Sequence, residues 1–92
     1  MKVEIFSKDG CPYCEYAKDF FYDNGISFKE TKLNNPEERK KFYESCGSNV
    51  GTVPQIFIDG KRIGGYSELL LQKNDVIGRA AIDFLNQENL KF

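Results

Sequence analysis

The sequence predicts an α/β fold in which a four-stranded mixed sheet has helices on both of its faces. Strand-like and helix-like apolar patterns follow one another in the order β-α-β-α-β-β-α-α. The first strand–helix–strand unit is of the length that joins two parallel strands by a right-handed crossover. A tight turn later in the chain joins two further strands as an antiparallel hairpin. We expect residues 1–92 to form a single domain.

The first unit spans residues 2–31. Residues 2–7 are rich in β-prone apolar side chains and predict a strand. From Pro12 onward, apolar residues recur at helical spacing, and Asn24-Gly25 supplies a stop. Apolar and polar residues then alternate over residues 26–31, which predicts the second strand.

A second helix and a hairpin follow. Asn35 is suited to cap the helix, with Pro36 at its first position and Glu38 completing a pattern close to a capping box. Residues 53–58 predict a strand that starts beside a proline, and residues 61–63 predict its antiparallel partner across an Asp-Gly turn.

The chain ends in two predicted helices. Residues 67–72 form the short one, and we expect Asp75 to cap the other. Gly78 interrupts the last helix on its outer face, at a cost of about 1 kcal/mol relative to alanine. The apolar residues of this helix form one stripe: Val76, Ile77, Ala80, Ala81, Phe84 and Leu85.

Composition excludes several classes of function. The formal net charge of −1 argues against nucleic acid or an anionic membrane as the main partner. No apolar run approaches the roughly 20 residues of a membrane-spanning helix, and the start of the chain does not resemble a signal peptide. Three cysteines are too few for a disulfide-stapled secreted scaffold. We therefore expect a cytoplasmic protein.

Two cysteines stand three positions apart in Cys11-Pro12-Tyr13-Cys14, between the first strand and the first helix. This spacing brings their sulfurs within reach of a disulfide. Cys11 is the expected nucleophile, because a helix N-terminus and a nearby cation, here Lys8, lower the pKa of a thiol from about 8.5 to roughly 3.5–7.5. Cys14, inside the first turn, is the expected resolving thiol. A buried pair that never reacts is the alternative.

Three stretches carry a resemblance to a known family. They are Cys11-Pro12-Tyr13-Cys14, residues 52–60 (TVPQIFIDG) and Ile63-Gly64-Gly65-Tyr66. In order and spacing they resemble the signatures of dithiol glutaredoxins, including the small bacterial and bacteriophage members. The resemblance implies a thioredoxin-like fold and glutathione-dependent disulfide reduction.

The resemblance also implies a glutathione site. Thr52-Val53-Pro54 would face the dithiol with a cis bond before the proline, which leaves the backbone of Val53 free to pair with the substrate. The Gly65 region would hold the γ-glutamyl end of glutathione. Ser67 stands where the family most often has aspartate, and it can cap the helix but brings no charge. The expected glutathione-binding residues are Lys8, Tyr13, Thr52, Val53, Pro54, Gly65, Tyr66 and Ser67.

The basic run at residues 39–41 and Cys46 each have a structural and a functional interpretation. The basic run at residues 39–41 is best explained as a solvated helix face, with one member as an alternative ligand for the glycyl carboxylate of glutathione. Cys46, on one face with Phe42, is expected to be a small buried apolar residue rather than a regulatory thiol. A closed zinc site is disfavoured because the chain has no histidine and only one further cysteine. We expect no metal.

The sequence therefore predicts a monomeric disulfide reductase with no tightly bound cofactor and with glutathione as its reducing co-substrate. Its substrates would be protein disulfides and glutathione mixed disulfides, and ribonucleotide reductase is a partner that the resemblance suggests. Two alternatives stay open at this point. One is a thioredoxin-type reductant served by a flavoprotein reductase, although the chain has no Trp. The other is a non-enzymatic carrier of an iron–sulfur cluster.

Overall fold

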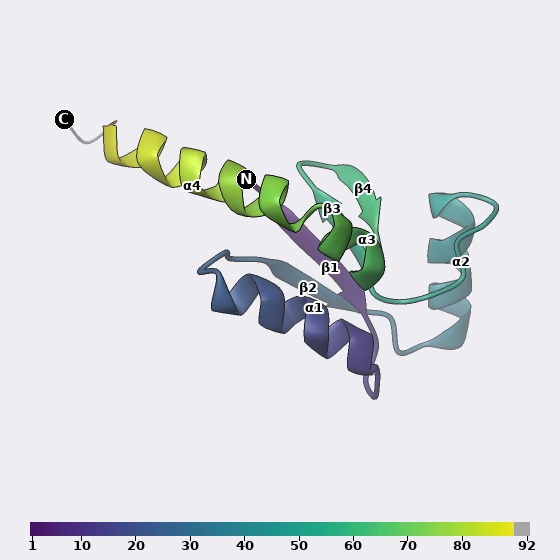
Figure 1. Ribbon diagram of the computed structural model, residues 1–92. Helices are drawn as coiled ribbons and strands as arrows, with labels where there is room; N and C mark the ends of the chain where they lie inside the picture. Colours follow the sequence, from purple (N-terminus) through teal and green to yellow (C-terminus); the bar gives the residue numbers. More distant parts are fainter. Residues whose placement is uncertain (90–92) are drawn as a thin grey trace.

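The computed structural model describes residues 1–89 and has the predicted order of elements (Figure 1). The four strands are β1 (Val3–Ser7), β2 (Lys29–Lys32), β3 (Gln55–Ile58) and β4 (Lys61–Gly64). The four helices are α1 (Pro12–Asp23), α2 (Pro36–Cys46), α3 (Tyr66–Leu71) and α4 (Lys73–Asn89).

The strands form one mixed sheet in the spatial order β2-β1-β3-β4. β1 runs parallel to β2 and antiparallel to β3, and β3 pairs antiparallel with β4. The β3–β4 turn has Asp59 and Gly60 at φ values of 53° and 81°, the left-handed conformation that an Asp-Gly hairpin turn requires. The predicted hairpin and parallel pair are confirmed.

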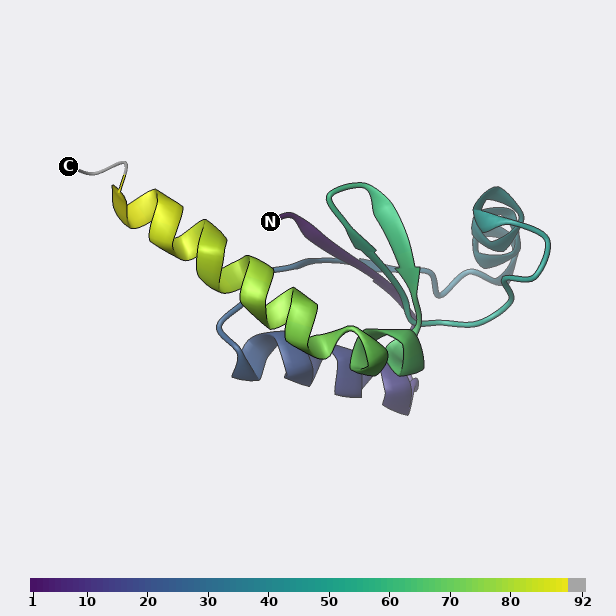
Figure 2. The ribbon, with the colours of Figure 1, turned by 45° about the horizontal axis from the view of Figure 1, so that its top comes forward.

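Successive residues of β1 point to opposite faces of the sheet, and each face is covered by different helices. Ile5 is fully buried in a cluster with Phe21 of α1 and Leu69 of α3. On the opposite face, Phe6 stacks on Phe42 of α2 with ring centroids 4.4 Å apart. Figures 1 and 2 show α1 and α3 side by side and α2 apart from them.

The second strand begins later than predicted. Residues 26–31 were expected to form it, but β2 covers Lys29–Lys32. The N–H of Ile26 donates to the carbonyl of Phe21 (2.9 Å), so this residue still belongs to the turn that ends α1. Ile26 and Phe28 pack on the core from the connection, which explains why their alternation resembles that of a strand.

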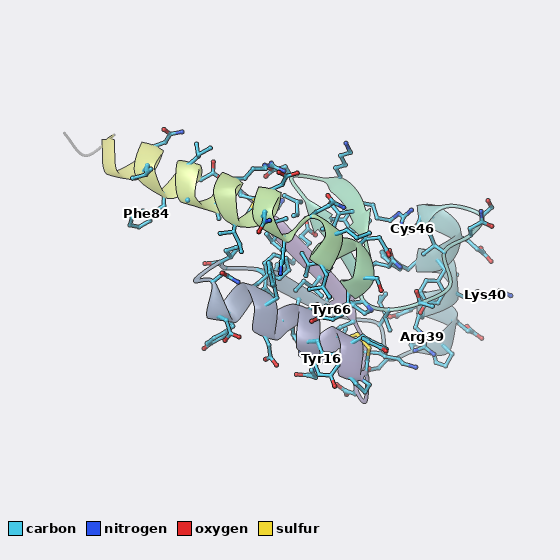
Figure 3. All side chains as sticks on the ribbon, in the orientation of Figure 1. Tyr16, Arg39, Lys40, Cys46, Tyr66 and Phe84 are labelled. Carbon is cyan, nitrogen blue, oxygen red and sulfur yellow. A yellow bond between two sulfur atoms is a disulfide. The ribbon has the colours of Figure 1, made fainter. Side chains whose placement is uncertain are left out.

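The last helix also differs from its prediction. α4 starts at Lys73, and the N–H of Val76 bonds to the carbonyl of Gln72, so Asp75 lies inside the first turn and is not the cap. Of the apolar stripe, Val76 is buried, whereas Phe84 is 61% exposed. Figure 3 shows Phe84 on the part of α4 that projects beyond the sheet. In residues 1–89 no helix is both long and apolar enough to cross a membrane.

Candidate active site

The two cysteines of the sequence motif lie where β1 gives way to α1. Cys11 is the N-cap of α1, Pro12 is its first residue, and the N–H of Cys14 lies 3.2 Å from Cys11 Sγ. The two cysteines form a disulfide, with their Cα atoms 5.2 Å apart. Cys14 is fully buried, whereas Cys11 retains 8% exposure. The sulfur of Cys11 is therefore the one that a reactant meets first.

A loop from the other half of the chain faces this pair. The Val53–Pro54 peptide bond is cis, as predicted, and the carbonyl oxygen of Val53 lies 3.6 Å from Cys11 Sγ. Within residues 1–89, the N–H and C=O of Val53 take part in no backbone–backbone hydrogen bond. They are free to pair with an extended ligand backbone.

Two side chains that sequence reasoning missed hold this loop. Gln55 is buried, and its Nε2 donates to the carbonyl of Thr52 (3.0 Å). Arg62, on the neighbouring strand β4, donates from its guanidinium to Gln55 Oε1 (3.1 Å). Gln55 follows the proline directly and was assigned to the strand alone. Its bond back to Thr52 depends on the bend in the loop, which no sequence pattern reveals.

The Gly64-Gly65 turn approaches the same loop from the other side. A Cβ on Gly65 would lie 3.3 Å from the carbonyl oxygen of Pro54, so glycine permits the close approach. Gly65 is the N-cap of α3, and its N–H donates to Glu68 Oε1 (2.9 Å). Ser67 was expected to cap this helix, which is wrong: Ser67 lies inside the first turn, and the carboxylate of Glu68 supplies the cap.

A cleft of about 350 Å³ lies between these two segments, beside the dithiol. Its lining includes seven of the eight residues expected to bind glutathione, together with Glu68. Lys8, the eighth, is partly exposed in the β1–α1 loop and is not part of the lining. The seven are Tyr13, Thr52, Val53, Pro54, Gly65, Tyr66 and Ser67.

The basic run on α2 contributes nothing to this lining. The guanidinium of Arg39 donates to the carbonyls of Leu33 (2.8 Å) and Asn34 (3.5 Å), so it ties α2 to the preceding loop. Lys40 is exposed and points away from the site (Figure 3). Cys46 is half-buried and unpaired.

An ion pair and a hydrogen bond at Asp9 stabilise the loop that precedes the dithiol. Asp9 accepts from Lys32 (2.9 Å) and from the side chain of Asn34 (2.9 Å). The hydrogen bond and charge of Lys32 hold the pKa of Asp9 below its ordinary value, and Asp9 raises the pKa of Lys32 in turn. These contacts join the loop before α1 to the end of β2 and the loop that follows it.

A second polar network lies under the dithiol helix. Glu30 accepts from the buried hydroxyl of Ser7 (2.7 Å) and pairs with Lys18 (3.0 Å), which also pairs with Glu15 (2.9 Å). Burial raises the pKa of Glu30, but the bonds from Ser7 and Lys18 outweigh it and the pKa is lowered. The pKa of Lys18 is raised by its bonds to Glu15 and then to Glu30. This network joins β1, β2 and α1.

Comparisons with known proteins agree with this geometry. Residues 3–63 match the Glutaredoxin family model. Glutaredoxin 3 of Escherichia coli K12 is 43% identical over 68 residues, which cover 73% of this chain and 80% of that protein. Glutaredoxin 1 from Francisella tularensis, solved as a cacodylate complex, has a TM-score of 0.80 and 40% identity, covering 84% of this chain and 96% of that one. A buckwheat glutaredoxin–glutathione complex has a TM-score of 0.68 and 28% identity, covering 82% of this chain and 70% of that one.

A dithiol at a helix start, facing a cis-proline loop on a four-stranded mixed sheet, defines a thiol–disulfide oxidoreductase of the thioredoxin-like fold. The family match narrows this class, and the chain belongs to the glutaredoxin family. It is a glutathione-dependent thiol oxidoreductase with an active-site cysteine pair.

Proposed function

We propose that this protein reduces protein disulfides and glutathione mixed disulfides, with Cys11 as the nucleophile and Cys14 as the resolving thiol. The observation that carries the assignment is the difference in burial within the pair. Cys14 is fully buried, whereas Cys11, beside the cleft, retains 8% exposure. An external sulfur can therefore reach Cys11, whereas the buried Cys14 is within reach of Cys11 alone.

The surroundings of Cys11 favour its thiolate. Once the disulfide is reduced, the N–H of Cys14 remains directed at Cys11 Sγ from the first turn of α1. The positive end of the helix dipole and this N–H both stabilise negative charge on sulfur. Lys8, three residues before Cys11, adds a cation in the preceding loop.

The reaction proceeds by two successive exchanges. The Cys11 thiolate attacks one sulfur of the substrate disulfide, which forms a mixed disulfide and releases the other sulfur as a thiolate. The Cys14 thiolate then attacks Cys11 Sγ, closes the Cys11–Cys14 disulfide and releases the second substrate thiolate. Two glutathione molecules restore the dithiol: the first forms a mixed disulfide at Cys11, and the second leaves with it as oxidised glutathione. For a glutathionylated protein, Cys11 alone suffices.

Glutathione occupies the cleft in this proposal. The free N–H and C=O of Val53 pair with its cysteinyl backbone, in the manner of an added strand. The backbone from Gly65 to Ser67 receives the γ-glutamyl carboxylate, and Lys8 attracts the glycyl carboxylate. Further side chains form the walls: Tyr13, Thr52, Pro54 and Tyr66. Glutathione acts as a co-substrate, with no tightly bound cofactor.

The partners follow from this chemistry. They are glutathione and proteins with accessible disulfides or glutathionylated cysteines, among which ribonucleotide reductase is one candidate. We propose that the protein works as a monomer in the cytoplasm, where glutathione keeps thiols reduced.

Single cysteine variants test the two roles. Cys14→Ser should still remove glutathione from a glutathionylated peptide, because this step needs only Cys11. It should lose at least about 100-fold in the rate of reducing an intramolecular peptide disulfide, because it cannot close the ring. Cys11→Ser should lose both activities. The measurement is peptide release followed by intact mass, which also detects one glutathione bound to Cys14→Ser.

The third cysteine supplies the matched control. Cys46→Ser, on α2, should retain both activities. Retention of glutathione removal by Cys11→Ser, or its loss in Cys14→Ser, would contradict the assignment of nucleophile and resolving thiol.

A further inference from the structure

Three tyrosines gather beside the dithiol on the face that α1 and α3 share. The ring centroids of Tyr13 and Tyr16 are 5.8 Å apart, and those of Tyr66 lie 6.1 Å from Tyr13 and 5.7 Å from Tyr16. Each ring thus contacts both of the others. We call this the tyrosine cluster, and Figure 3 shows two of its members, Tyr16 and Tyr66, side by side near the sulfur atoms.

The cluster is presented to solvent. Tyr13 is 61% exposed and Tyr16 is 50% exposed, whereas Tyr66 is partly buried. The core therefore does not account for the first two rings. Large aromatic surfaces left in water next to a reactive site are typical of contacts made with a partner.

The cluster extends the glutathione cleft in one direction. Tyr13 and Tyr66 line the cleft, but Tyr16, two residues beyond Cys14, does not. A small thiol peptide in the cleft meets the first two rings. A protein chain attached at Cys11 continues past the cleft and reaches Tyr16. Tyr16 is therefore placed to distinguish among protein substrates.

The charges on α1 and α3 favour a partner of positive charge. α3 carries one carboxylate and no cation. α1 carries three carboxylates and a single ammonium, that of Lys18, which is held by Glu15 and Glu30. The two helices that carry the rings thus have a net negative charge. A cation is attracted to aromatic ring faces, and the planar guanidinium of arginine stacks on them best.

We propose that the tyrosine cluster binds an arginine side chain that flanks the disulfide of a protein substrate, with Tyr16 as the specificity-determining residue. This inference rests on the proposed function, because it assumes that the substrate is held at Cys11. It adds the substrate class: polypeptides whose disulfide has a basic rather than an acidic or apolar neighbour.

Four synthetic peptides test it. Each has the same intramolecular disulfide and differs at one flanking position, which is arginine, glutamine, glutamate or leucine. The readout is kcat/KM with glutathione, glutathione reductase and NADPH at low ionic strength. We expect the arginine peptide to exceed the glutamine peptide by about 3–10-fold, with glutamate lowest. Equal rates, or a preference for leucine, would overturn the proposal.

Variants assign the preference to Tyr16. Tyr16→Leu should reduce the arginine-to-glutamine ratio to about 1–2, and Tyr16→Phe should keep it, because the ring face survives. Tyr22→Leu is the control: this tyrosine is 80% exposed on the far part of α1, and its loss should leave the ratio unchanged. An unchanged ratio in Tyr16→Leu would overturn the role of Tyr16.

Turnover of a small substrate distinguishes a failure of the tyrosine-cluster proposal from a failure of the proposed glutathione-dependent disulfide reduction. If the wild type reduces hydroxyethyl disulfide with glutathione but shows no arginine preference, only the cluster proposal fails. If it does not reduce hydroxyethyl disulfide, both proposals fail.

Discussion

At the scale of single residues, Ser67 stands at the position where dithiol glutaredoxins most often have aspartate, and the nearest carboxylate in the sequence is that of Glu68. Ser67 lines the cleft but carries no charge, and it is exposed within the first turn of α3. Glu68 carries the charge, but its Oε1 accepts the N–H of Gly65 and so closes the helix start. In the proposed site, the amino group of a γ-glutamyl ligand would meet the Ser67 hydroxyl in place of a carboxylate.

Ser67→Asp should therefore strengthen glutathione binding. A carboxylate at this position can pair with the ligand's amino group, and we expect the KM for glutathione to fall by about 3–10-fold. The gain should shrink as salt is added, because an exposed ion pair is screened. Ser67→Asn, similar in size and neutral, is the control and should change KM by less than about twofold. Equal effects of the two substitutions would contradict this account of the site.

The cysteines and the residues around the cleft could be predicted because each belongs to a short local pattern. The bond from Gly65 to Glu68 was not predicted, because Ser67 is the stronger cap by type. Gln55 and Arg62 were missed because their contacts join a loop to the neighbouring strand. Such contacts depend on register, which a sequence pattern leaves open.

At the scale of elements, the turn between β4 and α3 forms one side of the cleft. Gly64 has a φ of +113°, a conformation that other residues rarely adopt, and a Cβ there would lie 2.8 Å from Glu68 Cγ. Gly78, in α4, has nothing within 4 Å of the equivalent position and no unusual φ. The backbone conformation and the close contact thus require glycine at position 64, whereas neither requires it at position 78.

Alanine substitutions at Gly64 and Gly78 should change the free energy of unfolding in opposite directions. Gly64→Ala should lower the free energy of unfolding by about 1–3 kcal/mol, through backbone strain and the displaced Glu68 side chain. Gly78→Ala, in an exposed helix position, should raise the free energy of unfolding by about 0.5–1 kcal/mol. Urea unfolding measures both. A neutral Gly64→Ala would contradict the account of this turn.

The boundaries of elements with a definite capping signal were predicted well, whereas the predicted boundaries of elements without one differ from the structure by a few residues. Asn35 accepts from the N–H groups of Glu37 and Glu38, so α2 begins where the sequence indicates. Ile26 and Phe28 resemble strand residues, but they belong to a connection that packs on the core. α3 and α4 nearly adjoin, and no local signal distinguishes Gln72 from Asp75 as the residue before the final helix.

At the scale of the whole molecule, the sheet brings together loops that lie far apart in the sequence. The dithiol follows β1, the cis-proline loop precedes β3, and the glycine turn follows β4. The network of Ser7, Glu30 and Lys18 locks β1, β2 and α1 beneath that site. The parallel pair and the hairpin of the sheet were predictable from the crossover and hairpin rules, whereas the pairing of β1 with β3 was not predicted. The buried polar contacts were not predictable, because they depend on three elements at once.

The lowered pKa of Glu30 makes part of the stability depend on pH. The folded state favours its carboxylate, so this contribution is present above the ordinary pKa of 4.5 and is lost as the pH falls through the lower folded-state value. At pH 7, Glu30→Gln should lower the free energy of unfolding by about 1–2 kcal/mol. The difference from wild type should close towards pH 3, as wild-type Glu30 becomes neutral.

Urea unfolding from pH 7 to pH 3 measures this difference. Glu44→Gln, at an exposed position of α2, is the control and should stay within about 0.5 kcal/mol of wild type throughout. A gap between Glu30→Gln and wild type that persists unchanged at pH 3 would show that the charge of Glu30 is not what stabilises the fold.

The dependence of turnover on glutathione is measured by supplying the protein with one of two reducing systems. The protein is mixed with NADPH and hydroxyethyl disulfide, with either glutathione plus glutathione reductase or thioredoxin reductase alone, and NADPH consumption is followed. If the protein is a glutathione-dependent reductase, we expect turnover in the glutathione mixture and none above background with thioredoxin reductase. Turnover only with thioredoxin reductase would contradict this function.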